Sequence, residues 1–236
     1  HQLDSIQSKY KLSEVALTFD HGTIDHFKIV APELEKRGIK GLFFILTMIP
    51  EEQKLPTEDK QRKLETIYRK DLVKMLCEFK KISYSPEISK DYLSRFKFYS
   101  LEERYLRYLR DKKISSHDYK NFIDNVFEKN FGDQKKLIEE EYMNWNHIID
   151  LSQHGHIIGS HGHYHTGDKI DYAKSVKLIE LKINKRITCV SYPNGNKKIS
   201  DKDLTEIGIE TAYTTNETEG LGPFQASRID CLQLKI

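Results

Sequence analysis

Residues 14–46, EVALTFDHGTIDHFKIVAPELEKRGIKGLFFIL, contain two apolar runs separated by a helical stretch. EVALTFD (14–20) alternates as a strand does, and GLFFIL (41–46) is typical of a strand that is buried on both faces. Residues 24–37 between them predict a helix that Pro32 kinks or restarts. A strand, a helix and a second strand in this order predict a βαβ unit and therefore a parallel sheet.

The same alternation returns in the last third of the chain. Strands are predicted over 156–161, 187–193 and 210–216, and helices over 145–153, 172–185 and 201–207. Between these two parts lie long, charged segments with helical periodicity and few strand signals. We therefore predict one α/β domain built from residues 1–50 and 143–236, interrupted by a helical insert over 51–142.

The insert has the pattern of amphipathic helices. Seven apolar residues share one helical face: Leu64, Ile67, Tyr68, Leu72, Met75, Leu76 and Phe79. Ser100 and Glu103 have the spacing of a capping box. Residues 119–127 predict another amphipathic helix. The mixed charges of the insert are typical of solvated helix faces, although such an insert could also cover or build a substrate cleft.

Composition excludes some classes of function. The formal net charge of +2 argues against dedicated nucleic-acid binding, which needs a strong basic patch. The chain contains no run of 18 apolar residues, so the sequence predicts no membrane span. No signal peptide is recognisable, so a cytoplasmic location is expected, but a secreted or periplasmic one stays open because the chain begins at His1 rather than Met. Cys77, Cys189 and Cys231 form no CxxC pair and are expected to be free, mostly buried thiols.

The motif TFDHG (18–22) places an acid and an imidazole at the end of the first strand. In parallel α/β folds, active sites are built at the carboxyl ends of the strands. Asp20 and His21 therefore suit metal binding or proton transfer. The alternative is that Asp20 caps the following helix and that His21 lies on the surface.

The motif GSHGHYH (159–165) also follows a predicted strand. Six of the ten histidines of the chain lie between His147 and His165. His161 and His165 are four residues apart and can converge on one ion, because zinc, cobalt and nickel accept imidazole nitrogen. A polar surface loop with incidental histidines is the alternative.

The motif SYPNGN (191–196) follows a third strand. Its proline and glycine predict a turn that can direct backbone N–H groups outward, and such groups can stabilise an oxyanion. A plain turn is the alternative. All three motifs are expected at the same edge of the sheet.

TFDHG, GSHGHYH and SYPNG, in this order, resemble the motifs of the polysaccharide deacetylases, the NodB-homology carbohydrate esterases. The framing sequences 27–45, 144–161, 211–216 and 227–230 resemble the family as well, whereas the insert lies outside the resemblance. The family fold that this implies is an irregular (β/α) barrel.

The resemblance implies a role for each matching position. Asp20 falls on the proposed general base, and His21 falls on an Asp that binds the metal. His161 and His165 fall on the two metal-binding histidines, and Asn194 lies in the turn whose backbone N–H holds the oxyanion. The implied reaction removes the acetyl group from an N-acetylated sugar or glycan of a bacterial surface polysaccharide or its precursor. Zinc is the expected divalent metal, with cobalt or nickel as alternatives.

Two departures from the family pattern concern the metal and the base. His21 in place of Asp predicts a three-histidine site, or else a site in which Asp20 is itself a ligand. The Arg that often begins the third motif and holds the base is absent, and Ser191 or Tyr192 stands there.

A third departure concerns the general acid. No histidine follows His165, so the acid must come from His117, His147, the substrate or another subunit. A family member that binds carbohydrate without turnover, or a hydrolase of another amide or ester, remains an alternative. The sequence does not determine the oligomeric state.

Overall fold

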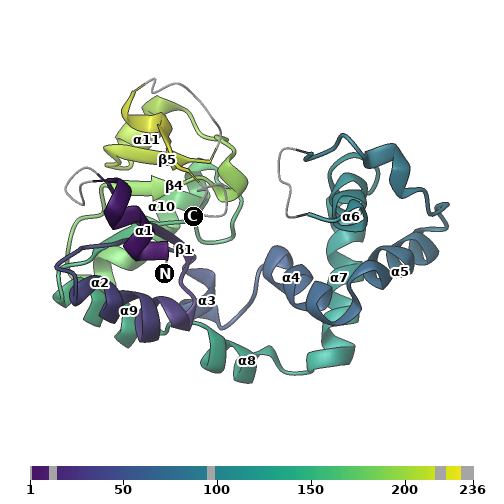
Figure 1. Ribbon diagram of the computed structural model, residues 1–236, viewed down its shortest axis with the longest axis horizontal. Coiled ribbons are helices and arrows are strands. Elements are labelled where there is room, and N and C mark those ends of the chain that lie inside the picture. Colours follow the sequence, from purple (N-terminus) through teal and green to yellow (C-terminus); the bar gives the residue numbers. More distant parts are fainter. Residues whose placement is uncertain (1, 11–14, 95–98, 216–221, 230–236) are drawn as a thin grey trace. The chain divides into compact units, whose positions relative to one another are not determined.

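The computed structural model describes residues 2–10, 15–94, 99–215 and 222–229. The chain divides into two compact units, the first formed by His1–Lys54 and Lys135–Ile236 and the second by Leu55–Gln134. All strands described belong to the first unit, which is an α/β structure (Figure 1).

The first unit contains one six-stranded parallel sheet with the strands in chain order. The strands are β1 (Thr18–His21), β2 (Leu42–Ile45), β3 (Ile157–Ser160), β4 (Cys189–Ser191), β5 (Thr211–Thr214) and β6 (Ala226–Ser227). The predicted parallel α/β sheet is confirmed, and each strand is shorter than its apolar run, because the flanking residues form the loops.

Helices precede and connect these strands. They are α1 (Gln2–Lys9), α2 (Ala31–Glu35), α3 (Met48–Glu52), α8 (Gln134–Glu141), α9 (Trp145–Gln153), α10 (Lys169–Ile183) and α11 (Asp201–Glu206), with short 3-10 turns at Pro193–Gly195 and Pro223–Gln225. A π-helical turn, His26–Val30, precedes α2, and Pro32 lies in the first turn of α2. The predicted restart of the helix at Pro32 is confirmed.

The main core lies between the sheet and the helices. Strand β2 is buried on both faces, as its sequence predicts: Phe43 and Ile45 belong to the main core, whereas Leu42 and Phe44 pack with Cys189 on the other face. Helices α9 and α10 pack against β3 and against each other (Figure 1). Burial of these apolar side chains stabilises the sheet by about 25 cal/mol for each Å² removed from water.

The sheet is curled. The first and last strands are at opposite ends of the strand order, yet Arg228, directly after β6, forms an ion pair with Asp20 on β1. No backbone pairing joins β1 to β6 in the part of the chain that the structure describes. The sheet is therefore a curled, open half-barrel whose first and last strands are bridged by side chains.

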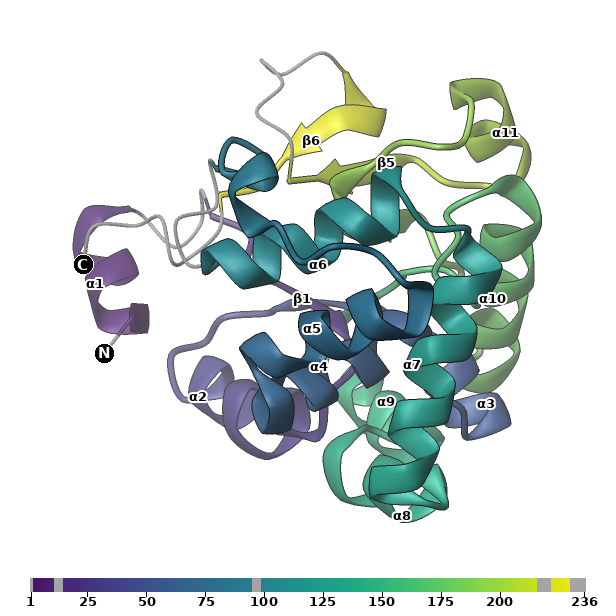
Figure 2. The ribbon, with the colours of Figure 1, turned by 90° about the vertical axis from the view of Figure 1, so that its right-hand side faces the viewer.

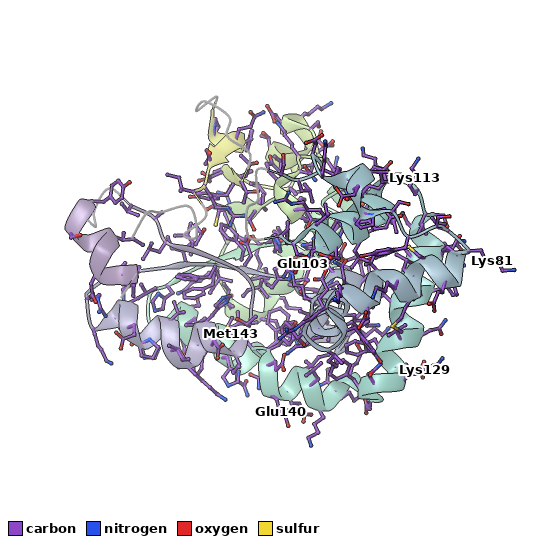
Figure 3. The ribbon with its side chains drawn as sticks, turned by 45° about the vertical axis from the view of Figure 1, so that its right-hand side comes forward. Lys81, Glu103, Lys113, Lys129, Glu140 and Met143 are labelled. Carbon is purple, nitrogen blue, oxygen red and sulfur yellow. The ribbon has the colours of Figure 1, made fainter. Side chains whose placement is uncertain are left out.

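The second unit is helical. Its elements are α4 (Thr57–Tyr68), α5 (Lys70–Lys80), α6 (Leu101–Lys112), α7 (Ser116–Phe131) and a 3-10 turn at Pro86–Ser89. Helix α4 packs against α7, and α5 against α6 (Figure 2). The Ser100–Glu103 capping box at the start of α6 is confirmed. Exposed lysines such as Lys81, Lys113 and Lys129 point outward, as solvated helix faces predict (Figure 3).

One expectation for the insert is wrong. The seven apolar residues between Leu64 and Phe79 do not share one helical face, because Arg69 adopts a positive φ of 47° and separates α4 from α5. Ile67 and Phe79 are half exposed in consequence. No helix described has the length and apolarity that crossing a bilayer requires.

Candidate metal centre

The carboxyl ends of β1, β2 and β3 are level with one another. His21 pairs with Ile45, and Ile45 pairs with Ser160, so that His161 begins the loop at the same edge as His21. Two strand spacings, about 10 Å, separate the backbones of β1 and β3. The imidazole rings of His21 and His161 nevertheless lie 4.9 Å apart between centroids, because the sheet is curled.

Three imidazoles form a cluster at this edge. One ring nitrogen from each of His21, His161 and His165 lies within 4.8 Å of the others, and all three side chains are buried. The ring of His21 is 4.9 Å from that of His161 and 5.0 Å from that of His165, between centroids. The structure thus brings together all three histidines that the sequence predicts as metal ligands, and this cluster could hold a metal ion.

The cluster fits a tetrahedral ion. The Nε2 atoms of His161 and His165 face each other at 3.2 Å. Two nitrogens bound to one zinc at about 2.0–2.1 Å would lie about 3.3 Å apart. Three neutral imidazoles also leave a fourth position for water or substrate, as catalytic zinc sites do. The donor set and its spacing therefore suit a divalent metal that accepts nitrogen.

Ser191 determines the tautomer of His161. The Ser191 hydroxyl donates to Asp20 Oδ1 at 3.1 Å, so its oxygen accepts from His161 Nδ1 at 2.6 Å. The Ser191 carbonyl is a second acceptor, 3.1 Å from the same Nδ1. With the proton on Nδ1, His161 Nε2 directs its lone pair into the cluster. Burial lowers the pKa of His161 well below its usual value, although Asp20 opposes this, so the ring is neutral and able to bind a metal.

Asp20 lies beside the cluster and is held by Arg228. Arg228 Nη1 donates to Asp20 Oδ1 at 2.8 Å, and Nη2 donates to Oδ2 at 2.9 Å. Burial alone would raise the pKa of Asp20, but the hydrogen bonds and the positive charge of Arg228 lower it well below its usual value. Asp20 is therefore a carboxylate at neutral pH, fixed in orientation by a bidentate pair.

Arg228 thus holds Asp20 in place of the Arg that the third motif lacks. Arg228 comes from the end of β6, whereas the motif itself supplies Ser191, which also donates to Asp20. Sequence reasoning identified 227–230 as a final strand and missed the role of its Arg. No local signal predicts it, because the partners are 208 residues apart.

Two of the histidines have left-handed backbones. His21 has a φ of 73°, and His165 a φ of 64°, which few residues other than glycine adopt. Such conformations concentrate at functional sites, where the surrounding structure compensates their cost. The alternative of a polar surface loop is wrong for His161 and His165. Both residues are buried, with exposed fractions of 2% and 5%.

Asn194 lies in the turn after β4, as predicted. It has a φ of 55° within the 3-10 turn, and its backbone N–H finds no acceptor among the residues described. Gly195 N–H instead donates to the Tyr192 carbonyl at 2.9 Å, which closes the turn. An N–H group in this state can donate to a ligand.

The other histidines of the window serve the structure. His147 accepts the Asn144 N–H in the capping box of α9. His163 contacts Thr47 Oγ1 at 2.9 Å and Glu52 Oε1 at 2.8 Å, so both its nitrogens are used away from the cluster. His117 lies on α7 of the second unit and bonds to Asn121. His147 and His117, named as candidate general acids, are not in the cluster.

The two cysteines that the structure describes take no part in this site. Cys77 and Cys189 are buried free thiols, as expected. Cys231 lies outside the described residues.

Comparisons with known proteins identify the fold. No protein-family model matches the chain, and no curated protein matches its sequence. Among solved structures, the chain is similar to the Streptococcus pyogenes deacetylase PplD in complex with acetate, with 13% identity and a TM-score of 0.50 over 97% of this chain and 70% of that one. It is also similar to IcaB from Ammonifex degensii, with 13% identity and a TM-score of 0.50 over 97% of this chain and 80% of that one. At this identity the likeness shows a shared fold.

Proposed function

We propose that the chain is a metal-dependent hydrolase of the polysaccharide deacetylase family that removes the N-acetyl group from an amino sugar of a bacterial surface polysaccharide or its precursor. The observation that carries the proposal is the buried cluster of His21, His161 and His165 beside the Asp20–Arg228 pair. The resemblance of the three motifs and the shared fold with the deacetylase PplD support it. Residues 1–50 and 143–236 would form the family's barrel, and 51–142 its insert.

The three histidines would hold zinc, with cobalt or nickel as alternatives. When bound, such a metal acidifies a water molecule and polarises the acyl carbonyl. Asp20 is the proposed base, because it is ionised, oriented by Arg228 and outside the histidine cluster. The Asn194 N–H is the proposed donor to the oxyanion that forms as the carbonyl is attacked. Arg228 is then a positioning residue that holds Asp20.

The test measures metal content and acetate release together. The purified chain is reconstituted with zinc, analysed for metal per chain, and assayed for acetate release from N-acetylglucosamine oligomers. We expect about one metal per chain in the wild type and in Asp20→Asn, with acetate release in the wild type alone. Loss of metal in Asp20→Asn would make Asp20 a ligand. Metal binding without acetate release from any glycan tested would contradict deacetylation.

A further inference from the structure

The loop that carries His165 is organised around one buried carboxylate. Asp171, in the first turn of α10, has an exposed fraction of 2%. Its Oδ1 accepts the backbone N–H groups of His163, at 2.8 Å, and of Tyr164. Its Oδ2 accepts those of Thr166, at 3.0 Å, and Gly167, at 2.9 Å. Four N–H groups of one short loop therefore converge on a single side chain.

These bonds enclose His165. Tyr164 and Thr166, its two neighbours in the chain, both donate to Asp171, one to each oxygen. His165 itself has the left-handed φ of 64°, a conformation that is strained for a residue with a Cβ. A loop of this shape needs compensating interactions, and hydrogen bonds to a charged group are among the strongest that a backbone can make.

The loop packs closely against the Asp171 carboxylate at Gly162. Gly162 has a φ of 85°, and a Cβ at this position would come closer to Asp171 Oδ2 than van der Waals contact allows. The Gly162 N–H donates to Ser160 Oγ at 3.0 Å, which anchors the start of the loop to β3. The backbone of the loop thus surrounds the Asp171 carboxylate.

Asp171 is held in turn by the cap of α10. Its own backbone N–H donates to Asp168 Oδ1 at 3.0 Å, and Asp168 is the N-cap residue of the helix. The carboxylate is therefore placed by a helix that packs against β3, so the position of the loop is coupled to the sheet.

From these contacts we infer that Asp171 is a positioning residue that sets the geometry of His165 before any metal binds. The inference rests on the proposed metal-dependent function and deepens it. A carboxylate is required because an amide has one acceptor oxygen. Its NH₂ group would face two N–H donors of the loop. Asp171→Asn should therefore keep the size of the side chain and lose two of the four bonds.

The test compares Asp171→Asn with Asp201→Asn. Asp201 lies in the first turn of α11, where its exposed side chain pairs with Lys197, so the second variant removes the same charge from a corresponding helix position outside the loop. Cobalt(II) is titrated into both metal-free variants and the wild type, and its visible absorption bands report ligand geometry. We expect Asp171→Asn to bind cobalt about 10- to 100-fold more weakly, the range typical of residues that orient metal ligands. Its cobalt spectrum should also be altered, whereas Asp201→Asn should match the wild type.

The outcomes separate the inference from the proposed function. Wild-type affinity and spectrum in Asp171→Asn would overturn the inference alone. A wild-type chain that binds no cobalt would overturn the proposed function, and the inference with it. If Asp171→Asn does not fold, hydrogen exchange in the metal-free wild type decides. The amides of residues 163, 164, 166 and 167 should be protected, and exchange at the rate of an open loop would contradict a preformed site.

Discussion

The two ends of strand β3 carry the same residue types and behave differently. Each end has a histidine beside a glycine with left-handed backbone: His156 next to Gly155 at the start, and His161 next to Gly162 at the end. His156 Nδ1 accepts the Gly41 N–H at 3.1 Å, and its Nε2 lies 3.3 Å from a carboxylate oxygen of Glu35. Both nitrogens of His156 are therefore used by the fold.

At the other end of β3, only one nitrogen of His161 is used by the fold. Its Nδ1 donates to Ser191, and its Nε2 faces the Nε2 of His165. With its proton on Nδ1, His161 offers an Nε2 lone pair beside the other two imidazoles, where a shared cation can bind. The comparison teaches that the partner of the second nitrogen separates a structural histidine from a candidate ligand, and that this partner comes from another segment of the chain.

The largest expected effect is loss of the metal. His161→Gln should abolish stoichiometric zinc binding, because it removes one of the three clustered imidazoles, whereas His156→Gln should retain zinc and lose only stability. Elemental analysis of both variants after reconstitution checks this. Equal zinc content in the two variants would remove the distinction between the ends of β3.

The Arg228–Asp20 ion pair at the carboxyl edge of the sheet should contribute more to the free energy of unfolding than the Arg186–Glu210 pair at the amino edge. Arg228→Gln leaves the largely buried Asp20 carboxylate without its charged partner, and we expect a loss of about 3 kcal/mol in the free energy of unfolding. Turnover should fall with it, while zinc remains bound.

The matched control is Arg186→Gln, before β4. Arg186 pairs with Glu210 on the surface, where the pair contributes about 0–1 kcal/mol. Urea unfolding measures the stability of both variants, and acetate release measures their turnover. Equal stability of the two variants would show that the curl of the sheet does not depend on Arg228.

The two glycines allow a smaller test. Gly155→Ala should cost about 1 kcal/mol for its positive φ, because the new Cβ would meet only the flexible side chain of Lys40, at 3.4 Å. Gly162→Ala should cost clearly more, because the added methyl group is forced against the buried Asp171. Thermal unfolding of the metal-free proteins compares them, and a smaller loss for Gly162→Ala would contradict the tight loop.

The effect that is smallest at neutral pH concerns a histidine that belongs to neither end. His26 packs against Phe19 and Phe43, and burial, only partly opposed by Asp20, lowers its pKa to about 4. Below a pH of about 6.5 the unfolded chain binds a proton that the folded chain does not, so stability should fall as the pH falls from about 6.5 to 4. This one group contributes at most about 1.4 kcal/mol per pH unit.

The stability of His26→Phe should therefore depend less steeply on pH than that of the wild type. Chemical unfolding of both metal-free proteins between pH 4 and 7 measures the two slopes. Identical slopes would mean that His26 binds its proton equally well in the folded and the unfolded chain, so that its pKa is not lowered by folding.

The sequence alone determined the parallel α/β class and where the candidate site residues lie along the strands. Apolar runs of 4–8 residues separated by helical segments specify a parallel sheet, because each strand must be buried on both faces. Motifs placed directly after such runs must lie at one edge, so Asp20, His21, His161 and Asn194 could be located before any coordinates. Helix caps at Asn144 and Ser100 were equally local, since a cap depends on residues three apart.

Only the tertiary structure decided how these residues meet. The curl of the sheet brings Arg228 to Asp20 across the whole strand order, and Ser191 fixes the tautomer of His161 from a different strand. The break at Arg69 and the left-handed backbone of His165 were also hidden from the sequence. These features depend on contacts between distant segments, and periodicity and spacing report only neighbours along the chain.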